Sequence, residues 1–213
     1  MIYRYHLKRL MDIVLSAIAF LLLSPVMLLI AVLVRTKLGS PVIFCQERPG
    51  KDEKIFKMYK FRSMTDARDE NGELLPDEVR LTKFGRALRS TSLDELPELW
   101  NIFKGDMSIV GPRPLLPKDV AYMDLMQHRR HEMRPGLTGL AQVSGRNALT
   151  WDTKLALDVK YVDTCSFIGD VKIFLRTIVK VFRREDIAFE TEGYDMDLKD
   201  WNERKSQQKQ KAM

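Results

Sequence analysis

The pattern of apolar and polar positions divides the chain into an uncharged N-terminal run and a mixed remainder. Residues 13–34 contain no charged side chain. As a helix with a rise of 1.5 Å per residue, this run is about 33 Å long, enough to cross the hydrocarbon core of a bilayer. We therefore expect a membrane-embedded segment at residues 1–38, a globular domain at residues 39–184 and a polar, loose tail at residues 185–213.

Ser24-Pro25 interrupts the apolar run near its middle. Pro25 lacks the N–H that would bond the carbonyl of Leu21, and the Ser24 hydroxyl is placed to compensate. Basic residues flank both ends of the run: Arg4, Lys8 and Arg9 before it, and Arg35 and Lys37 after it. Because Lys and Arg favour the cytoplasmic side, a helix that breaks and returns to the same face satisfies both flanks. On charge alone, a kinked helix that spans the bilayer is an equal alternative.

Beyond residue 39, strand-like alternation and helical spacing predict an α/β fold that is mostly α with a small sheet. A charge-rich loop at 66–77 has the length of a lid. The expected elements are strands at 40–46 and 54–64 around a turn at 49–52, helices at 80–89 and up to Gly105, a strand at 107–110, a helix at 116–133, a loop at 134–139, a strand at 140–143, and helices at 150–162 and 170–184.

The helix at 170–184 is expected to be amphipathic. Basic side chains gather on one arc and apolar side chains face the other way: Lys172, Arg176, Lys180 and Arg183 against Val171, Phe174, Leu175, Ile178 and Phe182. This pattern is typical of a helix on an anionic membrane surface. A core helix with a solvated basic face has the same pattern, so both interpretations stay open.

Composition indicates an anionic partner and a reducing compartment. The 213 residues carry a net charge of +6, which favours phosphate, nucleotide, nucleic acid or acidic lipid. Two cysteines, Cys45 and Cys165, do not make a disulfide framework. No P-loop or Gly-x-Gly-x-x-Gly occurs. The histidines, His6, His128 and His131, form no H-x-x-x-H or Cys/His pattern of a metal cage.

Candidate chemistry gathers at residues 92–101, where Asp94 and Glu95 are adjacent. Ser92 and Glu95 have the spacing of a capping box, which would put Asp94 near the positive end of a helix. Pro97 would be the fifth residue of that helix and lacks the required N–H. Alternatively, the helix begins near Leu96 and leaves both carboxylates on a loop.

Several cations are placed to bind phosphate. Alternation puts Lys60 and Arg62 on one face of a strand, although a solvated strand face has the same pattern. Arg89 precedes Asp94 by five residues. Arg113 lies between two prolines and Arg146 follows a glycine, so each guanidinium is presented from a fixed turn.

Taken together, these motifs resemble those of the bacterial sugar transferases, in particular the small monotopic phosphoglycosyl transferases of the PglC type, which initiate glycoconjugate assembly. The resemblance runs in matching order from about Lys8 to Arg184. It is carried by Ser24-Pro25, Lys60-Phe61-Arg62-Ser63-Met64, residues 89–97 (RSTSLDELP), residues 105–114 (GDMSIVGPRP), residues 134–139 (RPGLTG) and residues 142–147 (QVSGRN).

This resemblance implies a re-entrant helix broken at Ser24-Pro25 and a domain on the cytoplasmic face of the bacterial inner membrane. It also implies transfer of a phospho-sugar from a UDP-sugar to polyprenyl (undecaprenyl) phosphate with Mg²⁺, giving a polyprenyl-diphosphate-sugar and UMP. Asp94 would be the nucleophile of a covalent intermediate and a Mg²⁺ ligand, and Glu95 would assist it. The substrate-binding residues implied are Lys60, Arg62, Arg89, Arg113, Arg146 and Asp158.

The expected partners are thus the UDP-sugar, the polyprenyl phosphate and the lipid bilayer, and not nucleic acid. Overall resemblance favours an N-acetylated UDP-hexosamine as donor. A non-catalytic alternative is a membrane-tethered basic domain that binds nucleic acid or acidic lipid. It explains the net charge, but it gives Asp94 and Glu95 no role, and the chain carries no recognised nucleic-acid motif.

Overall fold

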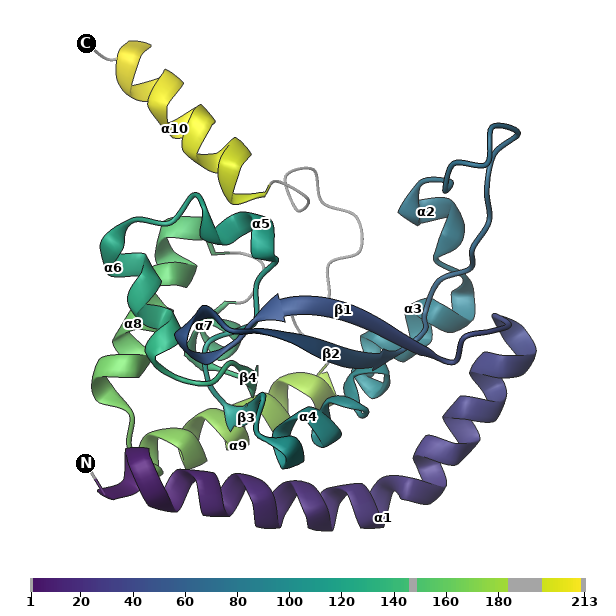
Figure 1. The fold of residues 1–213 in the computed structure, drawn as a ribbon, viewed down its shortest axis with the longest axis horizontal. Helices are drawn as coiled ribbons and strands as arrows, with labels where there is room; N and C mark the ends of the chain where they lie inside the picture. Colours follow the sequence, from purple (N-terminus) through teal and green to yellow (C-terminus); the bar gives the residue numbers. More distant parts are fainter. Residues whose placement is uncertain (1, 146–148, 184–196, 212–213) are drawn as a thin grey trace.

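Helix α1 (Lys8–Lys37) runs along one edge of the whole molecule and follows a π-helical turn, η1 (Tyr3–Leu7). The structure is a computed structural model that describes residues 2–145, 149–183 and 197–211. Figure 1 shows α1 bending on its way to the β1–β2 hairpin, and Pro25 lies inside it. The Ser24 hydroxyl donates to the carbonyl of Leu21 at 2.8 Å, so the predicted compensation for Pro25 is confirmed.

The N-terminal part of α1 is fastened to the globular domain by polar contacts. Lys8 Nζ lies 2.6 Å from Asp170 Oδ2, and Asp12 Oδ1 accepts from the N–H of Ile109 at 3.0 Å. Between them, the Arg9 guanidinium donates to two carbonyls at the end of helix α4 (Glu98–Lys104). Exposed apolar side chains cover much of the rest of α1, which is the one described helix long and apolar enough to cross a membrane.

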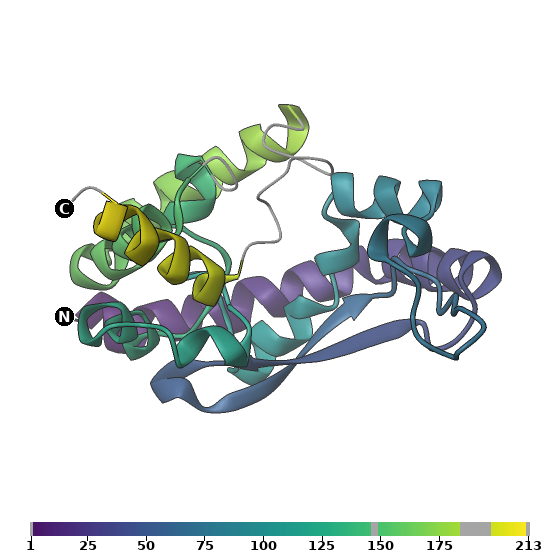
Figure 2. The ribbon, with the colours of Figure 1, turned by 90° about the horizontal axis from the view of Figure 1, so that it is seen from above.

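The C-terminal part of α1 returns to the same domain through apolar contacts. Ile30, Val34 and Leu38 are buried together with Phe61 and Leu88. Seen from above, α1 runs between the β1–β2 hairpin on one side and α9 on the other (Figure 2). Both ends of the apolar helix therefore pack on one body.

The predicted hairpin is confirmed. Strands β1 (Ile43–Pro49) and β2 (Ile55–Phe61) pair antiparallel, with Phe44 opposite Lys60. A 3-10 turn, η2 (Lys51–Glu53), closes the hairpin with positive φ angles at Asp52 and Glu53.

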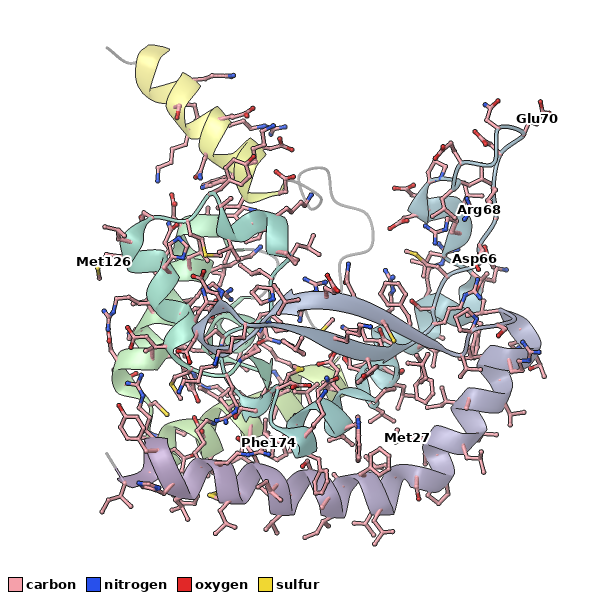
Figure 3. All side chains as sticks on the ribbon, viewed as in Figure 1. Met27, Asp66, Arg68, Glu70, Met126 and Phe174 are labelled. Atoms are coloured by element: carbon pink, nitrogen blue, oxygen red, sulfur yellow. The ribbon has the colours of Figure 1, made fainter. Side chains whose placement is uncertain are left out.

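The expected helix at 80–89 is wrong in its first residues. Leu81 has extended backbone, and Thr82 Oγ1 accepts from the N–H of Gly85, so helix α3 (Lys83–Ser90) begins after this cap. Arg80 ends a separate short helix, α2 (Asp77–Arg80). The expected loop at 66–77 is an arm, with Asp66 near its base and Glu70 near its tip (Figure 3).

Two further expectations fail where short apolar runs are ambiguous. The expected loop at 134–139 contains strand β4 (Gly136–Thr138), parallel to β3 (Ser108–Val110), so the described part of the chain forms two small sheets. The expected strand at 140–143 is helix α7 (Leu140–Ser144). Four apolar-rich residues fit a strand or a helical turn equally by pattern, and contacts with other elements decide between them.

The expected helix at 116–133 is three short elements: α5 (Pro117–Val120), α6 (Leu125–His128) and the 3-10 turn η4 (Arg129–Glu132). A capping box starts a new helix in the middle of this run. Asp124 Oδ1 accepts from the N–H of Gln127 at 2.8 Å, and the Gln127 side chain accepts from the N–H of Asp124 at 3.0 Å.

The last helices close the fold. Thr150 caps α8 (Trp151–Thr164) as expected, and α9 (Phe167–Arg183) confirms the expected amphipathic helix. The tail is not wholly loose, because residues 198–211 form α10 (Leu198–Lys211). Leu198 is fully buried against Met123 and Leu155, which anchors the start of that helix.

Candidate active site

The turn that carries Asp94 and Glu95 is a 3-10 turn, η3 (Leu93–Glu95), between α3 and α4. Ser92 precedes it with a φ of 54° and makes no capping hydrogen bond, so the capping-box interpretation is wrong. Helix α4 begins only after Pro97, which confirms the alternative of a later helix start. A positive φ at a residue other than glycine is strained and is typical of functional turns.

Lys60 of β2 joins this turn to the start of α4. Its ammonium lies 2.8 Å from Glu95 Oε1 and 3.2 Å from Glu98 Oε1. Glu98 is 3% exposed and Asp94 is 7% exposed. Three carboxyl groups thus lie close together in a largely buried environment, and two of them, Glu95 and Glu98, bond the Lys60 ammonium directly.

This crowding shifts the acidities. Burial and then the charge of Glu95 raise the pKa of Asp94, against the attraction of Lys60 and Arg89. The same two causes raise the pKa of Glu98 to about 7. Burial alone would lower the pKa of Lys60, but Glu95 and Glu98 outweigh it and the pKa is raised. The ammonium is therefore held charged, while burial and the repulsion from Glu95 disfavour the ionised forms of Asp94 and Glu98.

Arg113 is positioned by two chain segments, around Gly111 and Gly136, whose backbones pass close to each other. Gly111 donates its N–H to the carbonyl of Thr138, and Gly136 donates to the carbonyl of Pro112, both at 2.8 Å. A Cβ on Gly136 would come within 2.1 Å of the Gly111 nitrogen, so glycine is required there. The two glycine motifs thus brace each other and fix the turn that carries Arg113.

Asp158 lies behind this turn. It is 3% exposed and forms an ion pair at 2.7 Å with Arg130, which is itself 1% exposed. The same Nη2 atom of Arg130 also donates to the carbonyl of Arg113. Asp158 Oδ1 has no hydrogen-bond partner among the described residues. Asp158 thus contacts Arg130, which in turn supports the turn that carries Arg113.

The remaining cations are placed differently. Arg89 donates to Ser63 Oγ at 2.9 Å and is close enough to attract Asp94. Arg62 is bound to two carbonyls and to Asp66 at 2.6 Å, at the base of the arm, so the structure does not bring it to the carboxyl cluster. Arg146 lies outside the described residues. Substrate binding by each of them stays a prediction.

A cavity open to solvent lies beside the turn. Its polar lining comes from the end of α3 and the turn at η3, from the turn that carries Arg113, and from β4, α7 and α9: Ser90, Ser92, Glu95, Arg113, Thr138, Gln142, Thr177 and Lys180. Because α9 forms one wall, the amphipathic helix is continuous with the site.

The sequence reasoning missed Glu98, Arg130 and Lys180. Glu98 had a signal, because it follows Glu95 by three residues and such pairs share a face of a helical turn. Lys180 was noted on the basic arc of a helix, but no pattern placed that arc at a cavity. Arg130 had no signal, since its partners come from two distant segments.

The carboxyl cluster has the chemistry of a magnesium site. Mg²⁺ binds one or two carboxylates together with phosphate oxygens and water. Burial and then the charge of Glu95 raise the pKa of Asp94, and a divalent cation between these adjacent carboxylates would offset that charge. Asp94 and Glu95 would therefore hold a divalent ion here.

Comparison with known proteins identifies relatives along most of the chain. It is 52% identical over 181 residues to a protein of Bacillus subtilis (strain 168) named uncharacterized sugar transferase EpsL, covering 85% of this chain and 90% of that protein. It is 41% identical over 185 residues to the UDP-glucose:undecaprenyl-phosphate glucose-1-phosphate transferase of Klebsiella pneumoniae, covering 82% of this chain. It is 39% identical over 197 residues to the undecaprenyl-phosphate galactose phosphotransferase of Salmonella typhimurium, covering 84% of this chain.

The chain spans only 40% and 41% of the lengths of the last two proteins. The family model described as bacterial sugar transferase matches residues 3–184. That range includes α1, the carboxyl turn and α9, so the match covers every element of the site described above. It sets aside the non-catalytic alternative. The chain belongs to the bacterial sugar transferase family and is a transferase.

Proposed function

We propose that this protein transfers a phospho-sugar from a UDP-sugar to polyprenyl phosphate, giving a polyprenyl-diphosphate-sugar and UMP. The observation that carries the proposal is the pair of buried Asp94 and partly buried Glu95, beside a cavity that Arg113 and Lys180 also line. Cations near carboxylates suit a substrate that is itself a multiply charged phosphate. Relatives named for undecaprenyl-phosphate glucose and galactose transfer support the acceptor class and leave the sugar open.

In the proposed reaction, a carboxylate oxygen of Asp94 attacks the phosphorus that bears the sugar. The bond from that phosphorus to the bridging oxygen breaks, and UMP leaves with the bond's electron pair. An oxygen of polyprenyl phosphate then attacks the same phosphorus and releases the Asp94 carboxylate. The protein's contribution is to hold Asp94 in line with the phosphorus–oxygen bond that breaks. The strained turn at Ser92 and the position of α4 favour this alignment.

Positive groups offset the charge of the diphosphate. Arg113 is presented by its braced turn, and Lys180 lines the same cavity from α9. Lys60 holds Glu95 and Glu98, which keeps Glu95 beside the nucleophile. Mg²⁺ held by Asp94 would supply further neutralisation of the diphosphate.

We further propose that α1 is re-entrant. Its two ends pack on the same globular body, through Lys8–Asp170 at one end and Val34–Phe61 at the other. A helix that crossed the bilayer would separate those ends by its full thickness. The bend at Ser24-Pro25 and the basic flanks agree with both ends at the cytoplasmic face of the bacterial inner membrane.

The apolar side of α9 supports an interfacial position for the domain. Phe174 and Leu175 are 46% and 56% exposed, although each is strongly apolar. Trp100 of α4 is also half exposed and contacts Phe20 of α1, and tryptophan is typical of membrane interfaces. Such a position would bring the lipid acceptor to the cavity that α9 lines.

A release assay tests the reaction. Full-length protein in detergent is incubated with Mg²⁺, polyprenyl phosphate and one donor at a time: UDP-glucose, UDP-galactose or an N-acetylated UDP-hexosamine. We expect UMP release with at least one donor, matched by a lipid product that carries its sugar. UDP or free sugar phosphate in place of UMP would contradict the proposed bond cleavage.

Cysteine labelling tests the topology. In a background with Cys45→Ser and Cys165→Ser, single cysteines are introduced at Tyr5 and Thr36, which lie at the two ends of the apolar helix. We expect a membrane-impermeant reagent to label neither site in intact cells and both sites after lysis. Labelling of one end in intact cells would overturn the re-entrant model and favour a spanning helix.

A further inference from the structure

Three potential metal ligands meet at the tip of the β1–β2 hairpin, away from the carboxyl cluster. Glu53 comes from η2, His128 ends α6, and His131 lies in η4. Glu53 Oε1 is 2.5 Å from His128 Nδ1 and 3.3 Å from His131 Nδ1. A ligand atom from each of the three side chains lies within 4.8 Å of the other two.

His131 is the unusual member of this group. It is 5% exposed. Its Nδ1 lies 3.3 Å from Glu53 Oε1 without making a hydrogen bond, and its Nε2 has no hydrogen-bond partner among the described residues. A buried polar atom without a hydrogen bond costs free energy, so this buried imidazole needs an explanation.

The donor set selects the kind of ion. Two imidazoles and one carboxylate are a common zinc combination, with a fourth position left for water. Mg²⁺ and Ca²⁺ prefer oxygen ligands, so the two nitrogens disfavour them. The side chains of Glu53 and His128 are 41% and 35% exposed, which leaves an entry path and freedom to adjust around an ion.

We propose that Glu53, His128 and His131 form a binding site for a zinc-class divalent transition metal, separate from the catalytic carboxylates. Ile55 and Lys60 lie five residues apart along β2, so about 17 Å of strand separates the hairpin tip from the Cα of Lys60. The site would fasten the hairpin to η4. Arg130 in the same turn donates to the carbonyl of Arg113, so a bound ion would secure the support of the braced turn.

Metal binding to defined variants tests this proposal. Full-length protein is purified in detergent with a tag that lacks histidine, stripped with chelator, and titrated with Zn²⁺ in excess Mg²⁺. We expect one bound zinc per chain by elemental analysis. We also expect Co²⁺ to give the strong visible absorption of a four-coordinate ion. Glu53→Gln should weaken zinc binding at least tenfold and remove the zinc-dependent rise in Tm.

The controls separate the site from other ligands. His6→Gln, in η1, removes a histidine outside the group and should bind zinc like the native protein. His131→Gln removes the buried ligand and should also abolish binding, and Glu53→Gln covers the case in which that variant fails to fold. Absence of saturable zinc binding, or unchanged binding in Glu53→Gln, would overturn the proposal. None of these readouts depends on transferase activity.

Discussion

Two buried polar clusters in this protein differ in how well their charges are balanced. At the first, one carboxylate, Asp170, receives Lys8 and the hydroxyls of Tyr3 and Tyr161, at 2.6, 2.6 and 2.9 Å. At the second, the Lys60 ammonium bonds both Glu95 and Glu98, and Asp94 lies beside them.

The balanced cluster satisfies its charge within the fold, and it ties α1 to α9. In the unbalanced cluster, burial and then the charge of Glu95 raise the pKa of Asp94 and of Glu98. Proteins tolerate such an imbalance where a ligand completes the site. The cluster that holds the fold together and the cluster at the cavity thus contain similar residues, and their charge balance distinguishes them.

The largest effect that separates the two clusters is expected at Asp94. Asp94→Asn keeps the shape and removes the proposed nucleophile, so we expect UMP release to fall about a thousandfold or more. Because the pKa of Asp94 is raised, loss of its charge should leave the Tm unchanged or higher. Steady-state UMP release and a thermal melt on the same preparation measure both effects. A lower Tm in Asp94→Asn, together with the loss of activity, would instead indicate that Asp94 stabilises the fold.

The balanced cluster should respond in the opposite way. Asp170→Asn leaves the buried Lys8 ammonium without its counter-charge, and we expect a loss of about 3–5 kcal/mol in the free energy of unfolding. Denaturation in detergent measures this loss. Lys118→Met, which removes an exposed partner of Asp197, is the matched control and should leave the free energy of unfolding nearly unchanged. Equal effects of the two variants would contradict the structural role of Asp170.

A smaller effect on activity is expected at Arg113. Arg113→Lys keeps the charge but loses the planar fork that binds phosphate oxygens in pairs, so kcat/KM should fall about 10- to 100-fold. Arg129→Lys, on the exposed side of η4, makes the same exchange outside the cavity and should leave kcat/KM unchanged. Unchanged kinetics in Arg113→Lys would move phosphate recognition to other cations.

The smallest effect is a pH dependence of stability. The pKa of Glu98 is raised to about 7, above its usual value in an unfolded chain, so the folded state holds this proton more tightly. Its contribution is therefore most favourable below about pH 4.5 and is lost as the pH rises toward 7. Glu98→Gln should raise the unfolding free energy by roughly 1–3 kcal/mol at pH 8 and by much less at pH 5. The same gain at both pH values would contradict a titrating Glu98.

Local sequence patterns predicted the features that local chemistry decides. Pro25 and Ser24 predicted a repaired break in α1, and Pro97 gave the alternative of a later start for α4. Apolar spacing predicted α9 within three residues of its observed start. The order of the motifs placed Asp94 and Glu95 together with Arg113 before any contact was known.

Long-range contacts decided what the sequence did not predict. Strand β4 exists because Gly136 can approach Gly111, and no periodicity reports such a crossing. Arg130 joins Asp158 to the carbonyl of Arg113 across segments far apart in the chain. The capping box at Asp124 has a local signal, Gln127 three residues later, which the expectation of one helix at 116–133 did not take into account.

Intact-protein mass tests the central claim most directly. The protein is incubated with Mg²⁺ and its UDP-sugar, without polyprenyl phosphate, and its mass is measured at once. We predict an added phospho-sugar that Asp94→Asn lacks and Glu95→Gln forms more slowly, and that polyprenyl phosphate removes from the native protein. No adduct in the native protein while UMP appears only with acceptor, or an active Asp94→Asn, would contradict the covalent intermediate and favour direct attack by the lipid phosphate.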